Sequence, residues 1–166
     1  KNPFQVIATL LDRPQLLLTL QDYLHPERYR QVVPENYPEA LEIWKPLAEK
    51  GSTAAQLSLG AMYEQGQGVA QDYARAREWY EKAAAAGNAD AMRRIGLLHA
   101  VGDGVPQDYV KAREWYEKAA AAGNADAMWR IGLLYAAGHG VTRDSARARE
   151  WFEKGAASGD RDAMHS

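Results

Sequence analysis

The chain has 166 residues, of which 46% are hydrophobic and 25% charged, and its net charge is −2 at pH 7; this balance is typical of a folded globular protein. The charge provides no net cationic footprint for nucleic acid or an anionic membrane, and no apolar run approaches the roughly 18 residues of a membrane span. No cysteine is present, which excludes disulfides, thiol catalysis and thiolate metal sites. We therefore expect no nucleic-acid partner and no membrane insertion.

Residues 1–36 are predicted to form short helices that cap the remainder of the chain. Leucine occupies positions 16–18 and 20, which is too much leucine for an exposed helix. Asp12 and Pro14 suit the beginning of a helix. The sequence begins at Lys1 rather than Met, which fits either an excised piece or a mature chain that has lost a signal peptide.

From Tyr37 onwards the sequence is periodic. The segment EWYEKAAAAGNADAM occurs at residues 78–92 and again at 114–128, and Trp79, Trp115 and Trp151 recur 36 residues apart. A fixed period of this length indicates stacked structural repeats. We expect a half-repeat at 37–51, full repeats at 52–87, 88–123 and 124–159, and a partial repeat at 160–166.

Each full repeat is predicted to contain two helices. The first helix follows a residue whose side chain can cap it, and the second follows an aspartate; these residues are Ser52, Asn88, Asn124 and Asp160 for first helices, and Asp72, Asp108 and Asp144 for second helices. Met92, Ile95, Gly96 and His99 form one helical stripe. Paired glycines end each first helix, because positive φ is favourable only for glycine.

Two features inside the helices carry further expectations. A glycine in a helix costs about 1 kcal/mol relative to alanine, so glycines at one phase of three repeats indicate close approach of a bulky side chain; they are Gly60, Gly96 and Gly132. Glutamate precedes lysine by four residues in every second helix, which favours ion pairs of a few tenths of a kcal/mol; the pairs are Glu78–Lys82, Glu114–Lys118 and Glu150–Lys154.

The repeated pattern LGAMYEQGQGVAQDYARAREWYEKAAAAGNADA resembles the Sel1-like repeat, a relative of the tetratricopeptide repeat. The matching elements are Leu59-Gly60 with Tyr63, Gly66-x-Gly68-Val69, Ala76 with Trp79, and Lys82-Ala83-Ala84. The resemblance covers roughly residues 37–164, and it implies an all-α, right-handed α-solenoid of helix-turn-helix repeats with an N-terminal helical cap. This chain departs from the pattern at His99, Ser145 and Phe152, where other units carry tyrosine.

No residue pattern indicates catalysis, a metal site or a cofactor. None of the histidines, at positions 25, 99, 139 and 165, has a partner at zinc-motif spacing. His99 is interpreted as a packed histidine with its hydrogen bonds satisfied, and His139 as a solvated loop residue. The segments GQGVAQ and GDGVPQ lack the third glycine and the preceding strand of a dinucleotide site. Glutamates that recur in every unit are interpreted as a solvated face rather than a catalytic pair.

Residues that differ between the copies are the candidate binding residues, because packing residues must recur and binding residues need not. Three variable positions lie on one face of the first helices, those of Leu57, Ala61 and Glu64 in the first full repeat, and Arg94 and Arg130 flank that face. The resemblance implies that the first helices line the concave surface. Apolar and arginine side chains there suit a protein interface. The candidate partner-binding residues are Leu57, Ala61, Arg93, Arg94, Leu97, Trp129, Arg130 and Leu133. The alternative is that Trp129 and Leu133 are core residues.

The resemblance implies a non-catalytic module that binds a protein partner. Some bacterial Sel1-like proteins act as periplasmic immunity proteins against secreted antibacterial effectors, such as phospholipases of type VI secretion, and we expect this role. A regulatory scaffold in the cytoplasm is the alternative. An enzyme is disfavoured. The relatives linked to β-lactam binding have a disulfide in each repeat, whereas this chain has no cysteine. The uncapped C-terminal end also allows self-association.

Overall fold

The computed structural model describes residues 37–164, without the side chains of residues 39 and 160–164. Within this part the chain is all-α, as predicted, and forms seven helices. They are α4 (Tyr37–Glu49), α5 (Thr53–Gln65), α6 (Tyr73–Ala85), α7 (Ala89–Val101), α8 (Tyr109–Ala121), α9 (Ala125–Ala137) and α10 (Ser145–Met164). The predicted N-terminal cap, residues 1–36, lies outside the described residues.

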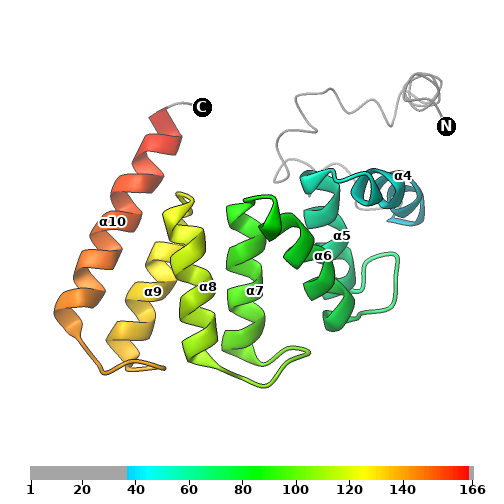
Figure 1. Ribbon diagram of the computed structural model, residues 1–166. Helices are drawn as coiled ribbons and strands as arrows, with labels where there is room; N and C mark the ends of the chain where they lie inside the picture. The colour runs from blue at the N-terminus through cyan, green and yellow to red at the C-terminus, as the bar shows by residue number, and fades with distance from the viewer. Residues whose placement is uncertain (1–36, 165–166) are drawn as a thin grey trace.

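The helices stack side by side in chain order, with α4 and α10 at opposite ends (Figure 1). In each unit the first helix packs against the second, giving the pairs α5–α6, α7–α8 and α9–α10, and each second helix also contacts the next first helix, α6 with α7 and α8 with α9. Three buried clusters follow one another along this stack. The arrangement is the repeat architecture that the periodicity predicts, in which each unit buries its apolar face against its neighbours.

The predicted caps define the helix boundaries. Asn88 and Asn124 each accept a hydrogen bond at 2.8 Å from the backbone N–H three residues later, and Ser52 does so at 3.4 Å. Asp72, Asp108 and Asp144 accept backbone N–H bonds at 3.0 Å at the start of α6, α8 and α10. The first helices end at glycines with φ between 66° and 91°, a region that favours glycine.

An aromatic ring occupies the space that a side chain would need at the glycine inside each first helix. A Cβ added at Gly60 would lie 2.3 Å from the Tyr80 ring, and one at Gly96 would lie 2.6 Å from the Tyr116 ring. In the third unit Phe152 takes the same place, 2.5 Å from such an atom at Gly132. The expected close approach is confirmed, and its partner is the second aromatic of the Trp-Tyr or Trp-Phe pair.

The expected ion pairs between glutamate and lysine in the second helices are wrong. The Lys82 ammonium lies 4.0 Å from the centre of the Trp79 ring, and Lys118 and Lys154 lie at 4.1 and 4.6 Å over Trp115 and Trp151. Among the ion pairs of residues 37–159, none joins Glu78 to Lys82, Glu114 to Lys118 or Glu150 to Lys154. A lysine three residues after a tryptophan covers the half-buried ring with its stem and places its charge on the ring face, which is worth about 0.5–1 kcal/mol at an exposed site.

The expectation that Asp160 caps a new helix is also wrong. The last helix, α10, continues through Gly159 to Met164, and Gly159 is not among the glycines with positive φ, whereas Gly87 and Gly123 are. In the earlier units the turn at this glycine brings the next first helix onto the previous unit. In α10 the glycine keeps helical geometry instead, so Asp160 lies inside the helix rather than before a new one.

Replacement of Gly96 by alanine should destabilise the protein, although alanine is the better helix former. The new methyl group would lie 2.6 Å from the Tyr116 ring and 3.1 Å from the Ala112 carbonyl oxygen, and overpacking of this kind costs about 1–3 kcal/mol. Urea unfolding should show this loss for Gly96→Ala and a smaller loss in a Tyr116→Leu background. A Gly96→Ala variant as stable as the parent would contradict the close contact.

Candidate functional site

The first-helix position at which the copies differ most faces the next unit along the stack. Leu57 lies in a buried cluster with Ala91 and Ile95 of α7. Arg93, the equivalent residue of α7, directs Nη1 to the Asp126 carboxylate of α9 at 3.3 Å. Trp129 is the equivalent residue of α9, and in the part of the chain that the structure describes no further first helix covers it. The side chain at this position is therefore an inter-unit residue in the first two units.

Leu57 is 8% exposed, so the expectation that it lies on an exposed binding surface is wrong. Its burial follows from the packing of α7 on α5 and α6. Ala61 and Leu97, which occupy one equivalent position a turn later, are half-buried. The sequence places these residues on one face correctly, but it does not show that the next unit covers that face.

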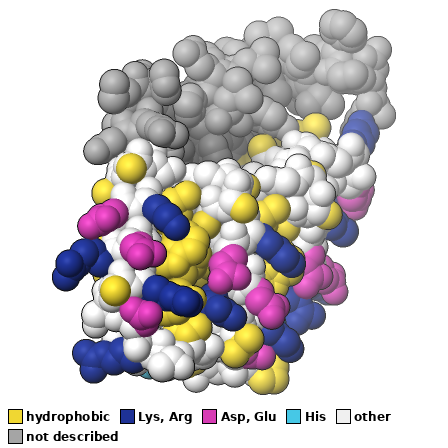
Figure 2. All heavy atoms as spheres, turned by 60° about the vertical axis from the view of Figure 1, so that its left-hand side comes forward, with side chains coloured by type: hydrophobic (Ala, Val, Ile, Leu, Met, Phe, Trp, Pro, Cys, Tyr) yellow, Lys and Arg dark blue, Asp and Glu magenta, His cyan; other side chains and the backbone are white. Residues whose placement is uncertain are grey.

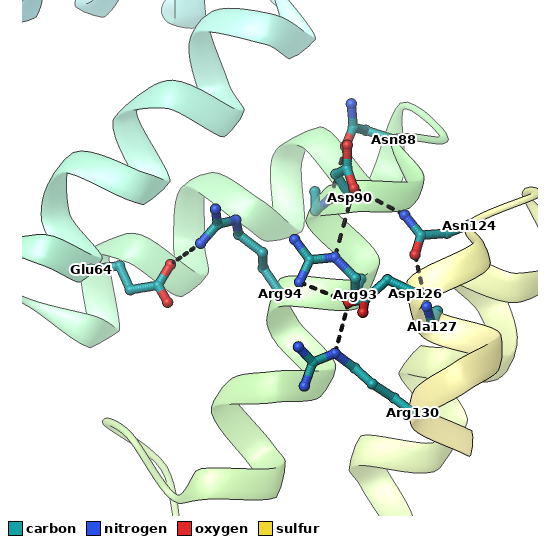
Figure 3. Close-up of polar contacts among 10 residues, drawn as sticks. Glu64, Asn88, Asp90, Arg93, Arg94, Asn124, Asp126, Ala127 and Arg130 are labelled. Carbon is teal, nitrogen blue, oxygen red and sulfur yellow. Dashed lines mark hydrogen bonds and ion pairs between the residues drawn. The ribbon is translucent and has the colours of Figure 1, made fainter. Parts of the chain in front are cut away.

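Arg93 lies in a polar network that joins the second and third units. Its guanidinium lies 3.7 Å from the Asp90 carboxylate and 3.3 Å from that of Asp126, and its side chain is 17% exposed. The Asn124 side-chain amide donates to Asp90 at 2.9 Å while its oxygen caps α9. Figure 3 shows Arg93 between the two carboxylates. The network fixes α9 on α7, so Arg93 acts in the joint and little of it is available to a partner.

Arg94 points the other way, toward the first unit (Figure 3). Its Nη1 donates to the Glu64 carboxylate at 2.8 Å, and the side chains of Arg94 and Glu64 are 14% and 17% exposed. The Tyr80 hydroxyl donates to the same carboxylate oxygen. Burial raises the pKa of Tyr80 far above its usual range, while Tyr80 and Glu64 outweigh burial and raise the pKa of Arg94. The group is a charged, largely buried contact between α5, α6 and α7.

Glu64 is a structural residue that the sequence interpretation placed on the variable face of the first helices but did not include among the partner-binding residues. Alanine stands at its position in the other units, at Ala100 and Ala136. As a result Arg130, the equivalent of Arg94, has no glutamate from the preceding first helix and instead donates to Asp126 of its own helix at 2.8 Å. Two positions could have revealed this pair in the sequence. From the first full repeat to the second, Ser58 is replaced by Arg94 and Glu64 by Ala100, so a single glutamate is available for an arginine of the next unit.

Trp129 and Leu133 are the exposed members of the predicted set. They are 50% and 41% exposed and lie one turn apart on α9, so the alternative that they are core residues is wrong. The Trp129 ring lies 5.5 Å from the Phe152 ring of α10. Ala156 of α10 is also exposed, whereas its equivalents Ala84 and Ala120 are 7% exposed beneath α7 and α9. We call Trp129, Leu133 and Ala156 the end surface.

The side of the molecule on which α10 is turned forward carries a strip of hydrophobic side chains with Lys, Arg, Asp and Glu side chains around it (Figure 2). Apolar surface surrounded by charge is the usual composition of a protein interface.

No described helix is long and apolar enough to cross a membrane. Residues 37–159 contain no group of carboxylates and histidines arranged to hold a metal ion.

The histidines that the structure describes occupy two different settings. His139 is exposed and its ring stacks on Tyr109 at 4.5 Å between centroids. His99 is half-buried, and its Nδ1 is buried without a hydrogen-bond partner among the described residues, so the expectation of a satisfied histidine is wrong. In the first unit the equivalent residue is Tyr63, and the Arg75 guanidinium lies 5.5 Å over its ring. In the second unit, which contains His99, the residue equivalent to Arg75 is Lys111.

Comparison with known proteins bears on this arrangement. The family model described as Sel1 repeat matches residues 29–52, 53–88, 89–124 and 125–160. A protective antigen of uropathogenic Escherichia coli, c5321, which displays an SLR fold, is 40% identical over 82% of this chain and 30% of its own, with a TM-score of 0.73. A Sel1 repeat protein from Oxalobacter formigenes is 34% identical over 94% of this chain and 65% of its own, with a TM-score of 0.75.

Cysteine-rich protein B of Helicobacter pylori shares the fold at 23% identity and a TM-score of 0.59, over 78% of this chain and 93% of its own. The comparison with curated proteins gives no match. This chain thus spans less than two thirds of the length of the first two relatives. Sel1 repeat proteins are typically protein-interaction scaffolds and generally non-catalytic binding modules.

Removal of the Glu64 carboxylate should destabilise the joint between the first two units. Glu64→Ala leaves the largely buried Arg94 guanidinium without its ion pair, which we expect to cost about 2 kcal/mol of unfolding free energy. The control is Glu81→Ala, since the Glu81 side chain is 51% exposed and its ion pair with Arg77 should be worth less than about 0.5 kcal/mol. Equal losses in urea unfolding would contradict the distinction.

His99 should make stability depend on pH in mildly acidic solution. Burial, and then the charge of Lys111, lower the pKa of His99, while Asp108 and Glu81 oppose this and Arg77 adds to it. The unfolded chain then takes up the proton first. The contribution to stability is therefore complete above about pH 6.5 and is lost as the pH falls toward the lowered folded pKa. Urea unfolding over a pH series should show a flatter profile for His99→Tyr, and an unchanged profile would count against this role.

Proposed function

Since the chain belongs to the Sel1 repeat family, we propose that it is a non-catalytic module that binds a protein partner through the end surface of α9 and α10. The observation that carries the proposal is the half-exposed Trp129 beside Leu133. Tryptophan is among the residue types most enriched at energetic hot spots of protein interfaces. The equivalent residue is a buried leucine in the first unit and an ion-paired arginine in the second. An exposed tryptophan ring at this position favours a contact with another molecule.

The polar residues of the predicted set support the same location. Arg93 and Arg94 are engaged in the joints between units and are 17% and 14% exposed, which leaves them little surface for a partner. Arg130 is more open, with 30% of its side chain exposed next to Trp129 in sequence. The proposed binding surface is therefore centred on Trp129 and Leu133 of the third unit. The Arg130 guanidinium is directed to Asp126 and lies 5.9 Å from the Tyr116 ring of the second unit, so it faces away from that centre.

More specifically, we propose that the partner is a secreted antibacterial effector and that the chain acts as its periplasmic immunity protein. The support for this role is the resemblance to bacterial Sel1-like proteins that have it, and the similarity to Sel1 proteins of Escherichia coli and Oxalobacter formigenes supports only a bacterial setting. The mechanism needs no catalysis, because occlusion of the effector's active site or of its membrane-binding surface would be sufficient.

Truncation of Trp129 should separate binding from folding. Because the ring is half exposed, Trp129→Ala should lower the unfolding free energy by about 1 kcal/mol or less, compared with about 3–5 kcal/mol for a core tryptophan. It should weaken binding to a candidate effector, to be sought among the products of adjacent genes, by about 2 kcal/mol or more. Calorimetric titration and an inhibition assay of that protein provide the measurement.

The matched control is Val101→Ala, which truncates a 53% exposed side chain at the end of α7, away from the end surface. It should change neither binding nor inhibition. Unchanged affinity in Trp129→Ala would remove the end surface from the interface. Binding of the candidate effector without any inhibition of it would reject the immunity role and favour a scaffold.

A further inference from the structure

We propose that the end surface is an acceptor for an α-helix of the partner protein, which docks on α9 and α10 as α7 docks on α5 and α6. The inference rests on the proposed function, because it names the element of the partner that the same surface binds. It requires no new fold: the chain already makes this contact twice within itself, between consecutive units.

The surface that each unit presents to the next is covered by a helix in the first two units and exposed in the third. In the first unit, α7 leaves Leu57 at 8% and Ala84 at 7% exposure. In the second unit, α9 covers Ala120, which is 7% exposed, and Arg93, whose side chain is 17% exposed. In the third unit Trp129 is 50% exposed. The end surface is thus equivalent to the surfaces that form the internal interfaces between units. At those interfaces the equivalent residues are buried by the helix that lies on them.

The two covering helices define the chemistry that fits. Each presents an alanine and an isoleucine four residues apart, Ala91 with Ile95 on α7 and Ala127 with Ile131 on α9, and all four side chains are completely buried. The alanine allows the helix backbone to approach closely, and the isoleucine fills the space one turn further on. The partner helix should carry a small residue and a branched aliphatic residue at this spacing.

The type of side chain on the acceptor determines whether charge contributes. At the second acceptor Arg93 receives the Asp126 carboxylate of the covering helix. At the third acceptor Trp129 stands in place of that arginine, as Leu57 does at the first. Arg130 is directed to Asp126 of its own helix at 2.8 Å. Helix docking on the end surface should therefore depend on apolar contact and should change little with salt, unlike an ion-paired joint.

The chain itself supplies a suitable probe, because α7 is the helix that covers an apolar acceptor. A hydrocarbon-stapled, fluorophore-labelled peptide of residues 88–102 is appropriate, since an unstapled helix of this length is marginal in water. Fluorescence anisotropy with the full chain should show saturable binding that is similar at low and high salt. Trp129→Ala and Leu133→Ala should each weaken it at least about tenfold, and Val101→Ala should leave it unchanged.

The outcomes separate this inference from the function on which it rests. An Ile95→Glu peptide that binds as well as the parent would show non-specific adhesion and overturn the helix acceptor. Absence of peptide binding, with Trp129→Ala still weakening effector binding, would also overturn it but leave the proposed function intact. If neither interaction depends on Trp129, both fail. A Trp129-dependent dimer of the chain alone, detected by sedimentation equilibrium, would assign the surface to a second copy and reject the partner helix.

Discussion

The architecture depends on the contact between an aromatic ring of each second helix and a glycine inside each first helix. A side chain at Gly60, Gly96 or Gly132 would overlap that ring, so the two helices can lie close only because the glycine offers bare backbone. The helix-propensity cost of about 1 kcal/mol per glycine is offset by burial of a large ring, as with Tyr80 at 0% and Tyr116 at 2% exposure. With the hairpin angle set in this way, every unit presents the equivalent face of its two helices, although the side chains on that face differ between units.

Polar joints then distinguish one unit boundary from another. Glu64 and Arg94 connect the first and second units, whereas Arg93 and Asp126 connect the second and third. The largely buried pair of Glu64 and Arg94 is weak evidence for stability, because desolvation opposes the Coulomb attraction. Their arrangement does favour one order of otherwise similar units, since Glu64 and Arg94 form their ion pair only across the first boundary. Arg93 and Asp126 also have partners on their own helices, Asp90 and Arg130. The residues that vary between copies therefore include joint residues as well as candidate binding residues.

The end surface follows from the same geometry. Position 57 of the first unit and position 129 of the third are equivalent, yet leucine is buried at one and tryptophan is half exposed at the other. The difference comes from the neighbour: α7 lies on the first, and among the described helices nothing lies on the third. Binding by this module is on this view an extension of the contact that holds the module together.

The sequence by itself determined the fold class, the repeat length, the helix caps from Ser52 to Asp144 and the purpose of the internal glycines. These features are local or periodic: a cap acts within three residues, and a repeated packing problem leaves the same letters in each copy. The sequence also identified Trp129 and Leu133 as members of one helix face.

Only the tertiary structure decided which members of that face are covered, because burial depends on the neighbouring unit rather than on helix phase. It placed Leu57 in the core and Arg93 and Arg94 in the joints, revealed Glu64 as a partner 30 residues away in sequence, and directed Lys82 to a tryptophan ring rather than to Glu78. It also continued α10 past Asp160, which shows that a residue able to cap a helix does not by itself end the helix before it.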